Sequence, residues 1–118
     1  MIKVVLVDDH QIVRDGIRLL IENMADIEVL AELGNARELI AMLKSIEPDL
    51  AIIDISMPDM SGIELTAYLS EHHPRIKVLI LSMYTSEEFI FNSIKAGASG
   101  YLPKNTTRQE LEAAIQEI

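Results

Sequence analysis

Short apolar runs alternate with segments of helical periodicity along nearly the whole chain. The apolar runs are Ile2 to Val7, Ile27 to Leu33, Leu50 to Ile53, Lys77 to Leu81 and Gly100 to Leu102. Several of them are rich in Val and Ile and almost continuously apolar, which is typical of strands buried on both faces of a parallel sheet. Five strands separated by helices leave few possible folds for the chain.

Apolar residues recur at helical spacing between these runs. They span Ile12 to Met24, Leu39 to Ile46, Ile63 to Leu69 and Phe89 to Ile94. Four segments also pair a capping residue with a Glu three positions later, a pattern that satisfies backbone amides at a helix start in both directions. These segments are Asn35 to Glu38, Ser61 to Glu64, Thr85 to Glu88 and Thr107 to Glu110. Gly97 predicts the end of the fourth helix.

This alternation predicts an α/β fold, because parallel strands need crossover connections and right-handed helical crossovers cover the sheet. We expect a flavodoxin-like (βα)5 three-layer sandwich, with a five-stranded parallel sheet in the order 2-1-3-4-5 and helices on both faces. A chain of 118 residues, 49% hydrophobic and 25% charged, fits a single domain spanning residues 1–118 without an internal linker.

Composition and charge exclude several classes of function. The chain contains no cysteine, which rules out disulfides, thiolate catalysis and cysteine-ligated zinc. With 10 Lys and Arg against 19 Asp and Glu, the formal net charge of -9 repels the phosphate backbone of DNA, so this chain alone is not expected to bind DNA. No apolar stretch has the length of a signal-peptide core or a membrane span, and we expect a cytoplasmic protein without membrane contact.

Polar residues follow four of the predicted strands, at the edge where sheets of this type bind ligands. The first strand ends in Asp8 and Asp9, and the third strand, its expected neighbour, ends in Asp54. Carboxylates about 4 Å apart repel by roughly 4 kcal/mol at an effective dielectric near 20, and oxygen ligands with room for water suit a neutralising Mg²⁺. Ser82 follows the fourth strand and Lys104 the fifth. A carboxylate nucleophile, a metal and a lysine are the parts that receive a phosphoryl group.

Each of these residues, taken alone, has a simpler explanation. Asp8 lies three residues before Gln11, which is the spacing of a helix cap, and Asp54 could be a turn residue. Ser82 alone is most often a strand-end hydroxyl, and Lys104 alone is a solvated surface charge. The functional hypothesis therefore depends on the convergence of these side chains in space.

The three histidines are not expected to take part in the chemistry. His10 has no second His at ligand spacing, so it is interpreted as a solvated residue at a helix start. His72 and His73 are interpreted as the end of the third helix, where the helix dipole favours positive charge.

The segments "VDD", "IIDISMPDMSG", "LS" and "YLPK" together resemble the response-regulator receiver domain of bacterial two-component signalling over essentially the full chain. The resemblance implies that Asp54 is the phosphoacceptor and takes its phosphoryl group from the phosphohistidine of a sensor histidine kinase. It also implies that Asp9, Asp54 and the backbone carbonyl of Ser56 bind Mg²⁺, with Asp8 helping through water.

The same resemblance implies a conformational switch. Ser82 and Lys104 would hold the phosphoryl oxygens, and on phosphorylation Ser82 would move inward while Tyr101 turns in. This change would alter the surface formed by the fourth helix, the fifth strand and the fifth helix. The chain departs from the family at two places: Pro103 precedes the lysine, where many receivers have Pro after it and often a cis bond, and Met83 replaces a small residue. A non-proline cis bond costs about 2.5 to 4 kcal/mol, so the isomer of the bond after Lys104 stays open.

The segments "DDH", "VRDG" and "LSMY" resemble the receiver branch that is joined to a LuxR-type helix-turn-helix domain. The chain ends at Ile118, inside the expected fifth helix. We therefore expect a C-terminal DNA-binding domain outside this chain, a homodimer promoted by phosphorylation and matched to two DNA half-sites, and control of transcription.

Two other classes of protein are the alternatives. A phosphohydrolase of the haloacid dehalogenase type also uses an aspartyl phosphate and Mg²⁺, but it carries D-x-D after its first strand, and position 10 of this chain is His. A flavodoxin-like binding module that is not phosphorylated would bind a flavin phosphate through hydroxyls and amides, and a negative crevice repels that phosphate.

Overall fold

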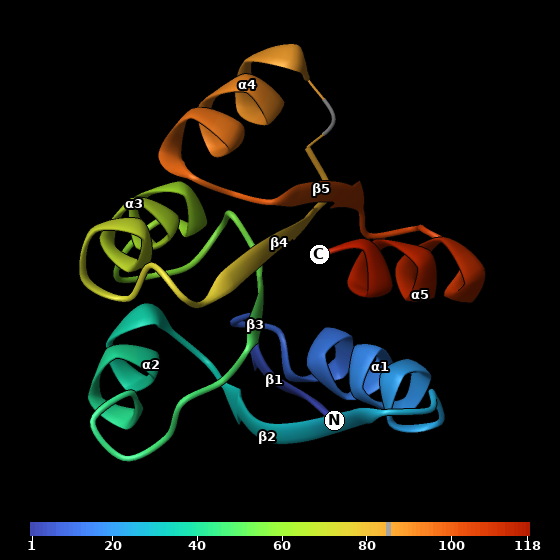
Figure 1. Ribbon diagram of the computed structural model, residues 1–118. Coiled ribbons are helices and arrows are strands. Elements are labelled where there is room, and N and C mark those ends of the chain that lie inside the picture. Colours follow the sequence, from blue (N-terminus) through green and yellow to red (C-terminus); the bar gives the residue numbers. More distant parts are fainter. Residues whose placement is uncertain (85) are drawn as a thin grey trace.

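A computed structural model of the chain describes residues 1–84 and 86–118, in which five strands alternate with five helices (Figure 1). The strands are β1 (Ile2–Val7), β2 (Ile27–Leu33), β3 (Leu50–Ile53), β4 (Lys77–Ser82) and β5 (Gly100–Pro103). The helices are α1 (Gln11–Glu22), α2 (Ala36–Met42), α3 (Gly62–His72), α4 (Glu87–Ala96) and α5 (Arg108–Glu117). All strand pairs are parallel, in the order β2-β1-β3-β4-β5, which confirms the predicted fold.

The helices cover the sheet in two layers: α1 and α5 lie on one face, and α2, α3 and α4 lie on the other (Figure 1). Successive side chains of a strand point to opposite faces, so β1 contributes to an apolar cluster on each side. Val4 and Leu6 belong to the cluster beside α1 and α5, whereas Val5 and Val7 belong to the other. All four are at most 1% exposed.

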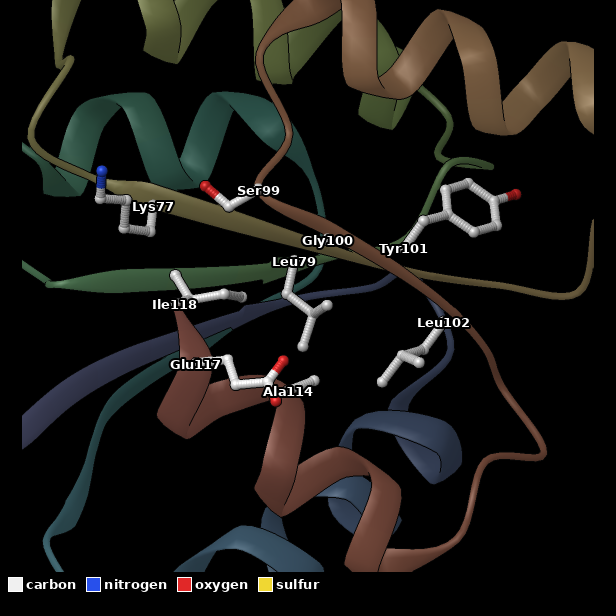
Figure 2. Close-up of a pocket in the computed structure, with 9 residues that line it drawn as sticks. All are labelled: Lys77, Leu79, Ser99, Gly100, Tyr101, Leu102, Ala114, Glu117 and Ile118. Carbon is white, nitrogen blue, oxygen red and sulfur yellow. The ribbon is translucent and has the colours of Figure 1, made fainter.

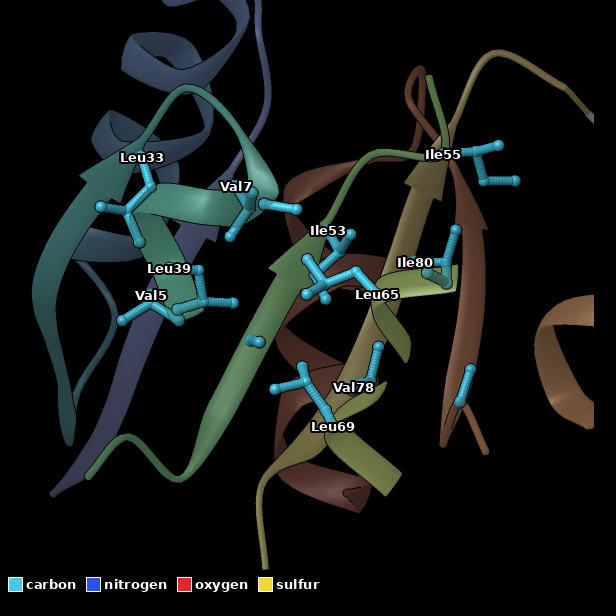
Figure 3. Close-up of a cluster of buried hydrophobic side chains, with 13 residues drawn as sticks. Val5, Val7, Leu33, Leu39, Ile53, Ile55, Leu65, Leu69, Val78 and Ile80 are labelled. Atoms are coloured by element: carbon cyan, nitrogen blue, oxygen red, sulfur yellow. The ribbon is translucent and has the colours of Figure 1, made fainter. Parts of the chain in front are cut away.

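Figure 3 shows the apolar cluster on the face of the sheet that α2, α3 and α4 cover. Val5 and Val7 of β1 and Ile53 of β3 point toward the helical layer, which supplies Leu65 and Leu69 of α3. Fully burying an aliphatic side chain of this kind contributes about 1.5 to 3 kcal/mol. The buried strands β1 and β3 therefore give the residues at their carboxyl ends fixed positions.

The starts of α3 and α5 confirm the sequence prediction. Ser61 and Glu64 form a complete capping box, and so do Thr107 and Glu110. Each box satisfies two backbone amides that the first turn of a helix leaves without partners.

α2 is shorter than the apolar spacing from Leu39 to Ile46 predicts. Asn35 caps its start by accepting a hydrogen bond from the Glu38 N–H, but the Glu38 carboxylate accepts from Gly34 rather than from Asn35, so the predicted box is incomplete. The helix ends at Met42, and the chain then turns, with the Ser45 N–H donating to the Met42 carbonyl at 2.9 Å. The apolar residues beyond Met42 pack against the core from this turn.

α4 begins one residue later than the capping pattern predicts. The expected cap, Thr85, lies outside the described residues, and the N-cap of α4 is Ser86, whose Oγ accepts from the Phe89 N–H. The helix ends at Gly97 as predicted, with a φ of 115° that a residue with a side chain rarely adopts. Within the described residues, no helix has both the length and the apolar character needed to cross a membrane.

Candidate functional site

The carboxyl ends of β1 and β3 bring three carboxylates together. The two strands pair in register up to their last residues, and the Asp54 N–H donates to the Val7 carbonyl at 2.9 Å. Asp8 and Asp54 therefore leave neighbouring strands at the same level of the sheet. One carboxylate oxygen each from Asp8, Asp9 and Asp54, together with one ring nitrogen of His10, lie within 4.8 Å of one another. The predicted convergence of the three acids is present, and His10 joins them.

Lys104 places a cation inside this acidic cluster. Its Nζ lies 2.9 Å from Oδ2 of Asp8 and 3.2 Å from Oδ2 of Asp54. The pairing of β4 with β5 sets this position, because Ser82 pairs with Pro103 and the Lys104 N–H donates to the Ser82 carbonyl at 2.9 Å. Asp8 is 3% exposed and Asp54 is 4% exposed, so both ion pairs are largely shielded from solvent.

The pKa shifts at this site follow from burial and from the excess of negative charge. Burial, and then the charge of Asp8, raise the pKa of Asp54 above its ordinary value, although Lys104 and a hydrogen bond from the Ser56 backbone favour the ionised carboxylate. Burial lowers the pKa of Lys104, but its bonds to Asp8 and Asp54 outweigh burial and raise that pKa overall. One ammonium group shared by two buried carboxylates, with Asp9 beside them, leaves the site negative.

The donor set fits a hard divalent cation. Asp8, Asp9 and Asp54 offer carboxylate oxygens, which are the ligands that Mg²⁺ prefers, and Asp9 faces solvent, where coordinated water has room. Ser56, the predicted source of a carbonyl ligand, lies in the exposed loop directly after β3. Asp8, Asp9 and Asp54 could hold a magnesium ion.

The alternative role of Asp8 as a helix cap is wrong. The N-cap of α1 is His10, whose side chain makes no capping hydrogen bond. Asp8 Oδ1 instead accepts from the His10 N–H at 2.8 Å, within the loop between β1 and α1. Arg14 supports the same loop from α1 by donating to the Asp8 carbonyl.

Gly62 allows the loop after β3 to close over Asp54. A Cβ atom added at Gly62 would lie 2.2 Å from the Asp54 carbonyl oxygen and 2.8 Å from the Ile55 Cα. The Gly62 N–H donates to the Ile55 carbonyl at 2.7 Å, which ties the start of α3 to this loop. No sequence pattern marks Gly62 for this position, because only the folded chain brings it against Asp54.

Ser82 and Tyr101 are connected through one backbone residue. Ser82, fully buried at the end of β4, accepts at Oγ a hydrogen bond of 2.9 Å from the Tyr84 N–H. The Tyr101 hydroxyl donates to the Tyr84 carbonyl. Sequence analysis missed this role of Tyr84, because the link uses its backbone and no side-chain pattern marks it. All peptide bonds of the described residues are trans, including the one that follows Lys104.

A separate hollow of about 540 Å³ is lined by residues of β4, β5 and α5 (Figure 2). Lys77 begins β4 and Ser99 precedes β5, so the hollow extends to the edge of the sheet opposite the acids. Asp8, Asp9, Asp54 and Lys104 do not line it. The acidic cluster therefore lies outside this hollow, which Tyr101 helps to line.

Comparison with known proteins gives consistent matches. The family model described as the response regulator receiver domain matches residues 4–116. The DNA-binding transcriptional activator DevR/DosR of Mycobacterium tuberculosis is 40% identical over 118 residues, which cover 100% of this chain and 54% of that protein. The chain spans about half the length of the curated relatives that it matches.

Solved structures agree with these matches. A LuxR-family two-component response regulator from Aurantimonas sp. SI85-9A1 superimposes with a TM-score of 0.91 at 36% identity, covering 98% of this chain and 82% of that one. A second match is the isolated REC domain of RcsB from Salmonella enterica serovar Typhimurium, determined in the presence of the phosphomimetic BeF3-. It superimposes with a TM-score of 0.90 at 28% identity, covering 98% of this chain and 88% of that one.

Proposed function

The chain belongs to the response-regulator receiver domain family, and on this premise we propose that Asp54 accepts a phosphoryl group from the phosphohistidine of a sensor histidine kinase. The observation that carries the proposal is the buried Asp54 carboxylate, held beside Asp8 with the Lys104 Nζ at 3.2 Å. In the transfer, a carboxylate oxygen of Asp54 forms a bond to phosphorus. The bond from phosphorus to the imidazole nitrogen breaks, and its electron pair stays on the imidazole.

A receiver domain is a signalling switch rather than a classical enzyme. The two alternatives, a phosphohydrolase of the haloacid dehalogenase type and a flavodoxin-like binding module, are not favoured, because the family match and the curated relatives are response regulators.

Asp8, Asp9, Asp54 and the backbone carbonyl of Ser56 would hold Mg²⁺, with Asp8 acting through water. The ion supplies positive charge that offsets the charge on the phosphoryl oxygens. The excess of carboxylates over cations at this edge supports the assignment. Asp9 is the most accessible of the three acids, and its role is to bind metal rather than to accept the phosphoryl group.

Lys104 and Ser82 would position the phosphoryl group on Asp54. The Lys104 ammonium already contacts the acceptor carboxylate, so it can bind an oxygen of a phosphoryl group on Asp54 while it keeps its bond to Asp8. Ser82 carries a hydroxyl at the end of the neighbouring strand β4 and can donate to a second oxygen once it turns toward Asp54. Both residues act by orientation and charge, which supply most of the catalysis in phosphoryl transfer.

The switch would work through Tyr84. When the Ser82 hydroxyl turns toward the phosphoryl group, it stops accepting from the Tyr84 N–H, and the loop after β4 loses that restraint. Tyr101, bonded to the carbonyl of the same residue, is then released to turn inward. A local change at Asp54 thus alters the surface around α4 and β5.

The whole protein would be a transcriptional regulator. The curated relatives have transcriptional or response-regulator names and are about twice as long as this chain, which leaves room for a LuxR-type DNA-binding domain outside it. Phosphorylation would promote a homodimer that places two such domains on two half-sites of DNA.

The proposal is tested by incubating the protein with Mg²⁺ and acetyl phosphate and measuring its intact mass. We expect the wild-type protein to gain one phosphoryl group and Asp54→Asn to gain none. Asp15→Asn, which removes an exposed acid from α1, is the matched control and should be phosphorylated like the wild type. Equal phosphorylation of Asp54→Asn and the wild type would overturn the assignment of the acceptor.

A further inference from the structure

His10 lies among the acidic residues although the sequence places it at a helix start. Its Nδ1 is 3.0 Å from Oδ1 of Asp9 and 3.4 Å from Oδ1 of Asp8. A ring nitrogen of His10 is also within 4.8 Å of a carboxylate oxygen of Asp54. The His10 side chain is 64% exposed, so ions in solution can reach it.

The His10 imidazole faces the acidic residues rather than the first turn of α1. His10 is the N-cap of α1, yet its side chain makes no hydrogen bond to the helix. Its own N–H donates to Asp8 Oδ1 at 2.8 Å, which fixes the loop with the ring facing Asp9. Two ligand atoms at right angles around one ion, each about 2.1 Å from it, are about 3.0 Å apart. The separation of His10 Nδ1 and Asp9 Oδ1 matches that spacing.

An imidazole changes which metals a carboxylate site prefers. Mg²⁺ takes oxygen ligands and keeps several waters, so a nitrogen ligand adds little to its affinity. Cobalt, nickel and zinc ions bind imidazole well and exceed magnesium in affinity for mixed nitrogen and oxygen sites. A site with one imidazole beside two carboxylates therefore discriminates between these two classes of ion.

We propose that His10 Nδ1 is a metal ligand alongside Asp9 and Asp54, and that it increases the preference of this site for first-row transition ions such as Co²⁺ and Zn²⁺ over Mg²⁺. This inference rests on the metal site of the proposed function and adds a ligand and a class of ion to it. The competing arrangement is a simple ion pair between a protonated His10 and Asp9, in which the ring contributes nothing to metal binding.

The test measures the dissociation constants of Mg²⁺ and Co²⁺ by calorimetry for the wild type and for His10→Gln. We expect His10→Gln to weaken Co²⁺ binding about tenfold or more while Mg²⁺ binding changes less than about twofold. His72→Gln, which removes an exposed histidine of α3 far along the chain, is the matched control and should change neither constant. An unchanged ratio of Co²⁺ to Mg²⁺ affinity in His10→Gln would overturn the inference.

A second readout locates the ion directly. In protein labelled with ¹⁵N-histidine, one equivalent of Zn²⁺ should shift the Nδ1 resonance of His10 and leave those of His72 and His73 in place. A His10 resonance that does not respond to Zn²⁺ would contradict the assignment.

Asp9→Asn separates this inference from the proposed function. If Asp9→Asn leaves Mg²⁺ affinity unchanged, the metal site of the proposed function is wrong and the role of His10 is wrong with it. If Asp9→Asn weakens Mg²⁺ binding while His10→Gln leaves the ratio of the two affinities unchanged, the proposed metal site stands and only the role of His10 is rejected.

Discussion

Two charged clusters flank β1, and they differ in the balance of their charges. Beside β2, the Arg18 guanidinium lies 2.9 Å from Glu32 and 3.1 Å from Glu22, and Arg14 Nε lies 3.5 Å from Glu32. The ion pairs of this cluster thus join two cations to two anions. Burial raises the pKa of Glu32, but its hydrogen bonds with Arg18 and Asp15 and the charges of Arg18 and Arg14 together outweigh burial and hold that pKa below the ordinary value.

The cluster at the carboxyl ends of β1 and β3 has the opposite character. There one ammonium group serves two buried carboxylates, and the pKa of Asp54 is raised rather than lowered. The difference shows how the same residue types serve two purposes. The balanced cluster joins α1 to β2, whereas the unbalanced one leaves an excess of negative charge that a cation would neutralise.

The largest expected effect comes from removing the cation of the unbalanced cluster. Lys104→Met leaves the buried carboxylates of Asp8 and Asp54 without the ammonium group that they share, and we expect the free energy of unfolding to fall by about 3 kcal/mol without metal. Saturating Mg²⁺ should recover part of this loss, because the ion binds only the folded state. Urea denaturation with EDTA and with Mg²⁺ measures both effects.

Lys44→Met, in the exposed turn after α2, is the matched control for that variant and should change stability little. A similar loss in the two variants, or a loss that Mg²⁺ does not reduce, would show that Asp8 and Asp54 are not left as unpaired charges.

The next effect concerns the backbone that holds Asp54. Gly62→Ala would place a Cβ atom 2.2 Å from the Asp54 carbonyl oxygen, so the backbone must shift. We expect the free energy of unfolding to fall by about 2 kcal/mol and phosphorylation by acetyl phosphate to become slower. Gly16→Ala, where an added Cβ meets nothing within 4 Å, is the control and should be neutral or slightly stabilising. A Gly62→Ala protein that is as stable and as reactive as the wild type would contradict this role.

Removing the carboxylate of Asp54 should change the free energy of unfolding less than these two variants do, and in the opposite direction. Because the folded protein raises the pKa of Asp54, the folded state binds this proton more tightly than the unfolded chain, and ionisation at neutral pH disfavours folding. Asp54→Asn should therefore be more stable than the wild type at neutral pH without metal, by less than about 1 kcal/mol.

The pH dependence of the stability difference between Asp54→Asn and the wild type tests the direction of the pKa shift of Asp54 independently. The advantage of Asp54→Asn should shrink as the pH falls and vanish below the ordinary Asp pKa of about 3.9, where Asp54 is protonated in both states. Thermal unfolding of both proteins across this range measures it. An advantage that grows toward low pH would show that the pKa of Asp54 is lowered.

The smallest effect is expected in the balanced cluster. The Arg18 side chain is 39% exposed, so solvent screens its pairs, and Arg18→Met should cost only about 0.5 kcal/mol. Because the pKa of Glu32 is lowered, this contribution is complete at neutral pH and is lost as the pH falls through the folded-state pKa of Glu32. If Arg18→Met lowered the free energy of unfolding as much as Lys104→Met does, the contrast between the two clusters would not hold.

The fold could be predicted from the sequence because each element carries its own signals. Runs such as Leu50–Ile53 are apolar throughout, and the Ser61 and Thr107 boxes depend only on residues three positions apart in a single segment. The end of α2 at Met42 could not be predicted, since apolar residues continue beyond it at helical spacing and pack on the core from a turn instead.

The acidic cluster could be predicted in part. The strand order alone places Asp8 and Asp54 at neighbouring strand ends, so their convergence follows from the fold. The contacts of His10 and Tyr84 could not be predicted, because they depend on how two loops turn after their strands leave the sheet.

The most direct test of the account traps the phosphorylated residue chemically. After incubation with Mg²⁺ and acetyl phosphate, borohydride reduces an aspartyl phosphate to homoserine, and trypsin separates residues 4–14, which hold Asp8 and Asp9, from residues 45–75, which hold Asp54. We expect tandem mass spectrometry to find homoserine at position 54 only, and far less of it when EDTA replaces Mg²⁺. Homoserine at position 8 or 9, or equal amounts at position 54 with and without Mg²⁺, would contradict the account.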